Sequence, residues 1–320
     1  MSGLRSLFGA PPPTVGIEIA ANRVTVVRLV PGSSPPAVGS ATAEPLAPGV
    51  VVPALNEPNI RDRGAVFNAL RRALDRTAAR RKRAVLVVPD TTAKVSLLRF
   101  EKVPARHADL VELIRWQVKK SVPFPVEDAQ LTFAPTGTVT EGGREFLVVL
   151  ARRDVVTEYE SVCQDAGVQV GVVDLATLNL VNAVVAAGAA PDGDWLLVNA
   201  AGEYLSVAIL RGTDVLFFRH RGSEGEDTLA DVVHQTAMYY EDRLQGRGFT
   251  RVLLGGEGAG ATAGDAAAAV RQQLEQRLRV RVDSIDPRPA IVLADRIAVN
   301  AALLDTLAPA VGLLLRERAV

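Results

Sequence analysis

The chain has 320 residues, 48% of them hydrophobic and only 5% aromatic, so it can bury an aliphatic core and is too apolar for a disordered protein. Lys and Arg together number 36, as do Asp and Glu, which removes the overall field that would attract nucleic acid or anionic lipid. The single cysteine, Cys163, excludes internal disulfides and cysteine-based zinc sites, and a cytoplasmic compartment follows.

Strands and helices alternate along the first half of the chain. Residues 14–19 and 24–30 are rich in β-branched side chains around a short turn, which predicts a hairpin. Residues 65–81 have helical spacing, and residues 84–88 form a continuous apolar run typical of a strand that is buried on both faces. The elements expected next are a strand at 94–100, a helix at 106–121, strands at 131–134 and 145–151, a helix at 155–166, a strand at 168–173 and a helix at 175–187.

The second half opens at Asp194 and repeats this order. The elements expected there are strands at 195–198, 204–210 and 215–219, a helix at 227–244, a strand at 251–254, a helix at 266–278, a strand at 280–282 and a mostly helical segment at 303–315. Each half therefore begins with a β-meander, followed by a helix and then by strands alternating with helices. This duplicated pattern predicts an α/β protein with two similar subdomains that face a cleft.

The sequence gives little support for a membrane-spanning segment or for a metal site. No run approaches the roughly 20 apolar residues of a transmembrane helix, and residues 1–10 lack the apolar core of a signal peptide, so we expect membrane association only through a partner. The three histidines, His107, His220 and His234, lie on separate expected elements without metal-ligand spacing. Cys163 lies in a helical stretch and is expected to be a buried, inert thiol.

One segment is more specific than the rest: a helix that ends in Pro123-Phe124-Pro125 and is followed by acidic residues, within residues 114–129. Four further segments are informative, namely residues 15–24, 146–156, 173–175 and 310–316. Read together, these segments resemble the PilM family of type IV pilus assembly proteins, and the resemblance extends over nearly the whole chain from Val15. It implies an actin-like (ribonuclease H-like) duplicated fold with an inserted subdomain, as in the division protein FtsA.

The resemblance also implies how the chain divides. Residues 1–13 are expected to be a flexible N-terminus, residues 14–91 with 156–193 an actin-like subdomain 1A, residues 92–155 the inserted subdomain 1C, and residues 194–320 subdomain 2A. Only a short segment separates the strand near Arg219 from the next helix, so subdomain 2B is expected to be missing or much reduced. Because that subdomain forms one wall of the nucleotide cleft, we expect the cleft to be open to water.

Actin-like ATPases hold ATP between two hairpin turns that usually carry Asp-x-Gly, where the acid orders water around Mg²⁺ and the glycine lets the backbone approach phosphate. Here the first turn reads Glu18-Ile19-Ala20 and the second Asn199-Ala200-Ala201, while Thr25 stands where the family has a lysine. A third, glycine-rich turn remains as Gly255-Gly256-Glu257-Gly258. The nucleotide-binding residues that the resemblance implies are Glu18, Ala20, Asn22, Asn199, Ala201, Gly255 and Gly256.

These losses all weaken a nucleotide site, so we interpret the chain as a PilM-like pseudo-ATPase with no catalytic residue, no metal site and no required cofactor. ATP and Mg²⁺ would bind only if the altered site still accepts them. By resemblance, the chain binds the N-terminal cytoplasmic peptide of a PilN-like inner-membrane protein and is peripheral to that membrane through this partner. The pilus motor ATPase and a second copy of the chain are further candidate partners, and nucleic acid is not.

The peptide groove is expected between the first and the inserted subdomains, as the resemblance implies. The candidate lining residues are Leu97, Arg99, Trp116 and Phe124, of which the two aromatic side chains are large apolar anchors of the type found at binding hot spots. Ordinary core packing explains Trp116 and Phe124 at least as well.

Four other functions stay open. An ATP-binding PilM-like ATPase is favoured by Glu18 and the Gly255-Gly256 turn and opposed by Ala20, Asn199 and Ala201. A GspL-like cytoplasmic module of type II secretion shares the fold but is expected to continue into a transmembrane helix, whereas this sequence ends at Val320 with Arg316-Glu317-Arg318 shortly before it. An FtsA-like filament former needs an amphipathic anchor, for which residues 313–320 are too short and too charged. A sugar kinase on the same fold lacks a catalytic acid that can be placed.

Overall fold

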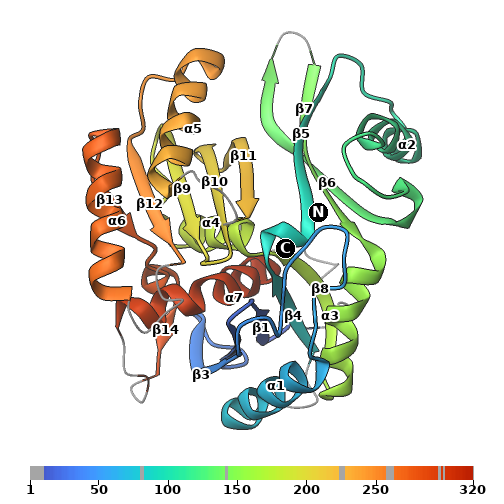
Figure 1. The fold of residues 1–320 in the computed structure, drawn as a ribbon, viewed down its shortest axis with the longest axis vertical. Coiled ribbons are helices and arrows are strands. Elements are labelled where there is room, and N and C mark those ends of the chain that lie inside the picture. Colours follow the sequence, from blue (N-terminus) through green and yellow to red (C-terminus); the bar gives the residue numbers. More distant parts are fainter. Residues whose placement is uncertain are drawn as a thin grey trace.

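The computed structural model describes residues 11–79, 83–140, 143–222, 228–256, 263–294, 297 and 300–319. The first ten residues of the expected N-terminal segment, and Glu257 and Gly258 of the third glycine-rich turn, lie outside these ranges. Two large sheets with two helices between them, and a smaller third sheet beside them, make up the fold (Figure 1).

The first sheet has six strands in the order β14-β3-β2-β1-β4-β8. The strands are β1 (Val15–Ile19), β2 (Arg23–Leu29), β3 (Ala37–Pro45), β4 (Arg83–Val88), β8 (Gln169–Leu175) and β14 (Val292–Leu293). The hairpin of β1 and β2 is antiparallel, while β4 runs parallel to both β1 and β8. Helices α1 (Arg63–Thr77) and α3 (Arg153–Asp165) cover one face, and we call this sheet with these helices the first lobe.

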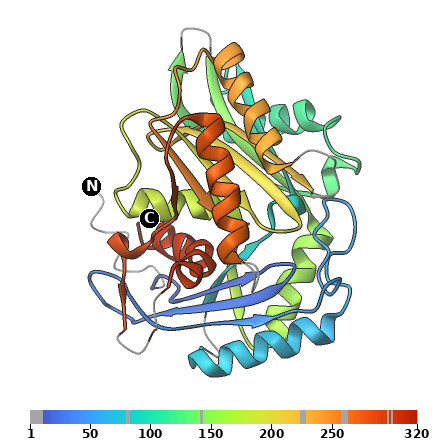
Figure 2. The ribbon, with the colours of Figure 1, turned by 60° about the vertical axis from the view of Figure 1, so that its left-hand side comes forward.

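The second sheet has five strands in the order β11-β10-β9-β12-β13. Strands β9 (Asp194–Ala200), β10 (Tyr204–Arg211) and β11 (Asp214–Gly222) form an antiparallel meander, to which β12 (Arg251–Gly255) and β13 (Val282–Ser284) add parallel strands. Helices α5 (Leu229–Leu244) and α6 (Ala263–Leu278) cover the outer face (Figure 2). This sheet and these two helices are the second lobe.

Helices α4 (Ala176–Ala186) and α7 (Ala301–Ala319) lie between the two large sheets (Figures 1 and 2). Gly312 of α7 lets them pack closely, because a Cβ at this position would lie 1.9 Å from the carbonyl oxygen of Asn179 in α4. The lobes therefore share a core that neither could complete alone.

The third sheet has three strands in the order β5-β7-β6 and stands in the sequence between β4 and β8. Its strands are β5 (Ala93–Phe100), β6 (Ala129–Thr140) and β7 (Gly143–Arg152), and helix α2 (His107–Val118) packs on one of its faces. The 3₁₀ turns η2 (Asp90–Thr92) and η3 (Val126–Asp128) lead into β5 and β6. We call residues 93–152 the three-stranded module.

Most expected elements are present, and the exceptions have a physical reason. Strand β3 was not predicted because Ala37–Pro45 consists largely of small residues and lacks the β-branched signal of a strand. The two-residue strand β14 was also missed, since no pattern of period two can be seen in so short a segment. None of the helices in the described ranges combines the length and apolarity that crossing a bilayer requires.

Candidate functional site

The two hairpin turns that the resemblance assigns to phosphate binding meet where the lobes join. Glu18 and Ala20 come from the β1–β2 hairpin, and Asn199 and Ala201 come from the β9–β10 hairpin. All four line one small cavity together with Gly256, which follows β12. The structure thus brings together most of the expected nucleotide-binding residues.

The two remaining expected residues lie next to this cavity without lining it. Asn22 precedes β2, and its Oδ1 accepts a hydrogen bond of 3.4 Å from Arg23 Nη1. Gly255 ends β12, where an added Cβ would lie 2.8 Å from Ile285 Cδ1, so this glycine serves close packing.

An ion pair between Glu18 and Arg23 forms part of the cavity wall. The β1–β2 register places Glu18 opposite Thr25, and Arg23, two residues before Thr25, lies on the same face of the hairpin. Arg23 Nη2 donates a hydrogen bond to Glu18 Oε2 over 3.1 Å, and the Arg23 and Glu18 side chains are 14% and 5% exposed. Burial raises the pKa of Glu18, and the neighbouring guanidinium opposes that shift. Arg23 therefore places a cation beside Glu18 in the wall of the cavity.

The carboxylate of Asp305, on α7, closes the cavity from another side. Its Oδ1 accepts a hydrogen bond from the backbone N–H of Gly256 over 2.9 Å. Gly256 has a φ of +80°, and a Cβ there would lie 2.3 Å from the carbonyl oxygen of Ala200. Only glycine lets the segment after β12 approach β9 so closely.

A buried polar network continues from the cavity to Asp90. Asn199 Nδ2 donates to Thr177 Oγ1 over 2.9 Å, and both the backbone N–H of Thr177, at 3.0 Å, and its hydroxyl donate to the Asp90 carboxylate. Ser206 Oγ donates to the same carboxylate over 2.5 Å. Burial raises the pKa of Asp90, and the hydrogen bonds from Ser206 and Thr177 oppose that shift. The network joins η2 and α4 to strands β9 and β10, so it fastens the second lobe to the rest of the chain.

The interlobe cavity has a volume of about 20 Å³, which is room for about one water molecule. Ligand sites usually measure roughly 300–1,000 Å³. Tyr204 and Arg23 line the cavity and fill the space between the hairpins, and Glu18 and Asn199 are only 4% and 3% exposed. The expectation of a cleft open to water is therefore wrong, because the chain closes it with its own side chains. Nowhere in the described residues do three His, Cys, Asp or Glu side chains group closely enough to hold a metal ion.

Sequence reasoning missed four residues of this site: Arg23, Asp90, Tyr204 and Asp305. The hairpin register was enough to place Arg23 beside Glu18, because alternation along β2 puts it on the same face. Asp90 also carried a signal, since it follows a buried parallel strand, and α/β proteins place site residues at the carboxyl ends of such strands. Tyr204 also carried a signal, because it begins β10 in the same hairpin turn as Ala201, whose backbone N–H donates to the Tyr204 carbonyl oxygen over 3.0 Å. Asp305 reaches the site only through the packing of α7, which no local pattern reveals.

A larger hollow lies on the face of the three-stranded sheet that is opposite α2. One cavity, of about 410 Å³, is bounded by β6 and β7 on one side and by α3 and β8 on the other. A second, of about 310 Å³, is bounded by β6, β7, α4 and the turn between β10 and β11. Thr132, Val149 and Asp174 line both cavities, so the two form one continuous groove, which we call the β6 groove.

The β6 groove combines aliphatic side chains of β7 and α4 with a few fixed polar groups. At its middle, Asp174 forms an ion pair with Arg316 of α7. At its far end, the backbone N–H of Gly137 in β6 donates to Asp214 Oδ1 over 2.9 Å and links the three-stranded module to the second lobe. A surface of this kind can hold an extended and largely apolar chain segment.

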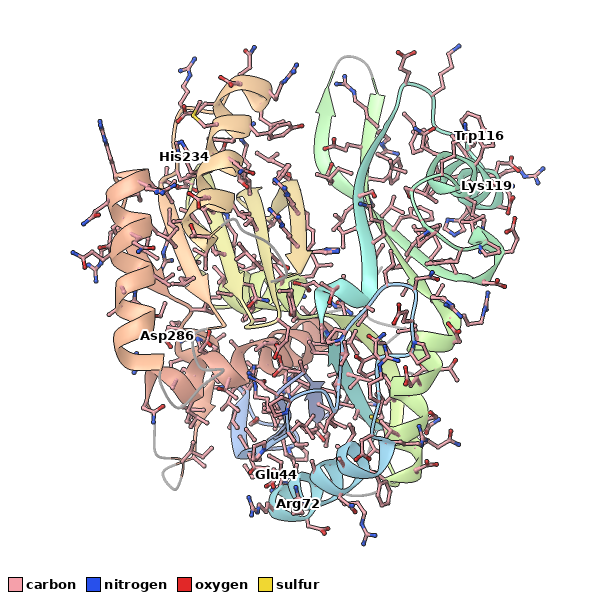
Figure 3. The ribbon with its side chains drawn as sticks, in the orientation of Figure 1. Glu44, Arg72, Trp116, Lys119, His234 and Asp286 are labelled. Carbon is pink, nitrogen blue, oxygen red and sulfur yellow. The ribbon has the colours of Figure 1, made fainter. Side chains whose placement is uncertain are left out.

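The four residues expected to line a peptide groove do not come together. Leu97 and Arg99 lie on the face of β5 that is opposite α2, whereas Phe124 is half-buried in the core beneath α2. Trp116 is 73% exposed and points outward from α2 (Figure 3), so it is not a core residue either. None of the four lines the β6 groove. The expectation of one groove formed by these residues is corrected, because the sheet itself separates the two pairs.

Three comparisons place the chain among known proteins. The family model described as "Type IV pilus assembly protein PilM" matches residues 16–247. A solved structure described as a PilM–PilN type IV pilus biogenesis complex matches with a TM-score of 0.79 and 20% identity, covering 96% of this chain and 99% of that chain. A protein of unknown function from Bacteroides thetaiotaomicron with an actin-like ATPase fold matches with a TM-score of 0.52 and 7% identity, covering 96% and 98%. No curated protein sequence is similar enough to count as a match.

The two structural matches establish an α/β fold of the actin-like ATPase type, as the sequence predicted. At identities of 20% and 7%, these matches show the fold alone, so the function has to be argued from the residues of this chain. The match of the family model extends from the first residues of β1 to just beyond the end of α5, and so includes both hairpins of the interlobe cavity and the whole three-stranded module.

Proposed function

Because the chain belongs to the PilM family of type IV pilus assembly proteins, we propose that it is a scaffold of the pilus assembly platform at the inner membrane. Its ligand is the cytoplasmic N-terminal segment of a PilN-like membrane protein, held in the β6 groove. The fold shared with a structure described as a PilM–PilN complex supports this assignment. In this role the protein stands on the cytoplasmic side and reaches the membrane through its partner.

The contrast between the two hollows carries the proposal. The first cavity of the β6 groove, at about 410 Å³, falls within the roughly 300–1,000 Å³ of ordinary ligand sites, whereas the interlobe cavity of about 20 Å³ does not. Grooves with apolar walls and a few fixed polar groups suit extended peptides. The contrast therefore favours a peptide over a nucleotide as the ligand.

We further propose that the protein works without hydrolysing ATP. A nucleotide in the position used by actin-like ATPases would have to displace Arg23 from Glu18, because this pair lines the space between the hairpins. It would also meet the methyl groups of Ala20 and Ala201 where glycine normally lets the backbone approach phosphate. Glu18 and the Gly255-Gly256 turn favour the alternative, an ATP-binding PilM-like ATPase.

We also propose the division of the chain that the resemblance implies, although α3 already begins at Arg153, and β14 and α7 join the first sheet and its core. Subdomain 1A takes residues 14–91 and 156–193, the inserted subdomain 1C takes 92–155, and subdomain 2A takes 194–320. Strand β11 ends at Gly222 and α5 begins at Leu229, so six residues (223–228) stand between them. So short a connection supports a second lobe whose 2B insert is missing or much reduced.

Calorimetric titration with a synthetic peptide of the PilN-like protein's N-terminal segment tests the peptide assignment. Gly171 lines the first cavity, and a Cβ there would meet only Arg83 Nη2, at 3.9 Å, so Gly171→Leu should fill the groove without disturbing the fold. Gly222 is the matched control, because a Cβ there has no atom within 4 Å. We expect Gly171→Leu to weaken binding about tenfold or more, or about 1.4 kcal/mol, and Gly222→Leu to leave it unchanged. Equal binding by the two variants would remove the peptide from this groove.

Titration with MgATP tests the nucleotide assignment separately. We expect no detectable heat at millimolar nucleotide, because entry requires the Glu18–Arg23 ion pair to break. Micromolar binding would put the ATPase alternative first, and Glu18→Gln would then be the first variant to make. Heat could also come from nucleotide bound in the β6 groove. Repeating the titration with Gly171→Leu, which fills that groove and leaves the interlobe cavity intact, separates the two sites.

A further inference from the structure

The strand β6 presents its edge, and not only its side chains, to the groove. Among the described strands, β7 alone pairs with β6, which is the terminal strand of its sheet. The run Thr132, Phe133, Ala134, Pro135 and Thr136 lines the second cavity without a gap. Successive side chains of a strand point to opposite faces, so a cavity lined by five residues in a row borders the backbone edge of β6 as well as one face of the sheet. Such an edge carries N–H and C=O groups that await a partner strand.

The opposite wall of the same cavity is a helix and not a strand. Leu178, Val181 and Asn182 of α4 face the edge of β6 across the second cavity, and Leu147 and Val149 of β7 border it. The second cavity thus has the unpaired backbone edge of β6 on one side and mostly apolar side chains on the other. An extended peptide satisfies both walls, because its backbone can pair with β6 while every second side chain packs against α4.

The two cavities lie end to end along this edge. Gln130 and Thr132 of β6 line the first cavity, and the residues from Thr132 to Thr136 line the second. At roughly 3.3 Å per residue, Thr132 to Thr136 spans about 13 Å, which matches about five residues of an added strand. A chain that occupies the first cavity therefore runs into the second without a change of direction.

We propose that the partner segment binds by adding a fourth strand to the three-stranded sheet, paired with the free edge of β6 and packed against α4. This inference rests on the proposed peptide ligand and states how the peptide is held. Affinity then comes largely from main-chain hydrogen bonds, and specificity comes from the alternate side chains that reach Leu178 and Val181. The contact between Gly137 and Asp214 marks the end of the added strand, because it occupies the edge of β6 beyond Thr136.

Hydrogen exchange with and without the synthetic N-terminal peptide of the PilN-like protein tests this inference. We expect the amides between Thr132 and Thr136 that face away from β7 to gain protection when the peptide binds, whereas those that already pair with β7 should not change (Pro135 has no amide). Amides of Leu97 and Arg99, on the opposite edge strand β5, are the internal control and should not change. Protection of β5 instead of β6 would overturn the added strand. Protection of neither strand, in a complex that calorimetry shows to have formed, would do the same. Neither outcome would contradict the peptide as the ligand.

A scan of the peptide by backbone N-methylation gives an independent reading. An added strand predicts losses that alternate along the peptide, about tenfold at every second position, because only the N–H groups that face β6 donate hydrogen bonds. If the losses of affinity do not alternate along the peptide, the strand pairing is refuted, although the peptide can still occupy the groove. Failure of the unmodified peptide to bind at all would refute the proposed function together with this inference.

Discussion

Removal of the Arg23 guanidinium tests whether an ion pair holds the interlobe site together. Arg23→Ala leaves the Glu18 carboxylate buried without its cation. Coulomb's law with an effective dielectric of about 20 gives about 5 kcal/mol for two unit charges at their separation of 3.1 Å. Water that enters the vacated space recovers part of this energy. We therefore expect the free energy of unfolding to fall by about 3 kcal/mol at neutral pH, the lower end of the range for broken buried pairs.

The same substitution has a predictable pH dependence. An acid whose pKa is raised on folding stabilises the folded state below its unfolded pKa, and this contribution is lost as the pH rises through the folded value. The pKa of Glu18 is already raised from its ordinary value of 4.5 by burial, and without the opposing guanidinium it rises further. Arg23→Ala should thus lose most stability at neutral pH and regain part of it as the pH falls toward 4.5.

Urea denaturation of four proteins completes the experiment: the unchanged chain, Arg23→Ala, Glu18→Gln and the double variant Glu18→Gln/Arg23→Met. The double variant removes both charges and should recover most of the loss, since apolar replacement of a buried pair is often neutral. If Arg23→Ala unfolds with the original free energy, or if the double variant is no more stable than Arg23→Ala, the ion pair does not hold the site. The argument from its burial would then be wrong.

Three further predictions concern other buried positions. Asp90→Asn replaces the acceptor of three hydrogen bonds by an amide, so urea unfolding should show a loss of about 1–3 kcal/mol; no change would mean that this network does not fasten the lobes. Gly312→Ala puts a methyl group 1.9 Å from the Asn179 carbonyl oxygen, so the thermal midpoint should fall by the equivalent of about 1–3 kcal/mol, whereas Gly222→Ala should leave it unchanged. Burial raises the pKa of Cys163 to about 12, so iodoacetamide should label it only in denaturant, and rapid labelling of the folded protein would contradict its burial.

Local patterns in the sequence were sufficient for most of the secondary structure. The apolar runs of β1 and β4 identified strands buried on both faces, and the helical spacing of Val66, Leu70 and Leu74 placed the buried face of α1. Strand β3 escaped because its small side chains carry no such signal, although it pairs with β2 along most of its length.

Of the two candidate sites, one was predicted well from local patterns and the other was not. The hairpin turns predicted from Glu18 and Asn199 do meet in one cavity, because they occupy corresponding positions in the two halves of a duplicated fold. The expectation that Trp116 and Arg99 line one groove failed, because both were chosen by residue type and local position. The face that each side chain occupies depends on how the sheet separates α2 from the lobes.

By itself, the sequence determined the elements, their duplicated order and the family, because periodicity and turn chemistry act over a few neighbouring residues. Only the tertiary structure decided that the interlobe cavity is closed and that the open groove lies along β6. Those outcomes depend on contacts between residues far apart in the chain, such as Asp90 with Ser206, 116 positions later, and Gly137 with Asp214, 77 positions later. The positions of such pairs are set by how both lobes pack around α4 and α7, and this packing has no local signature in the sequence.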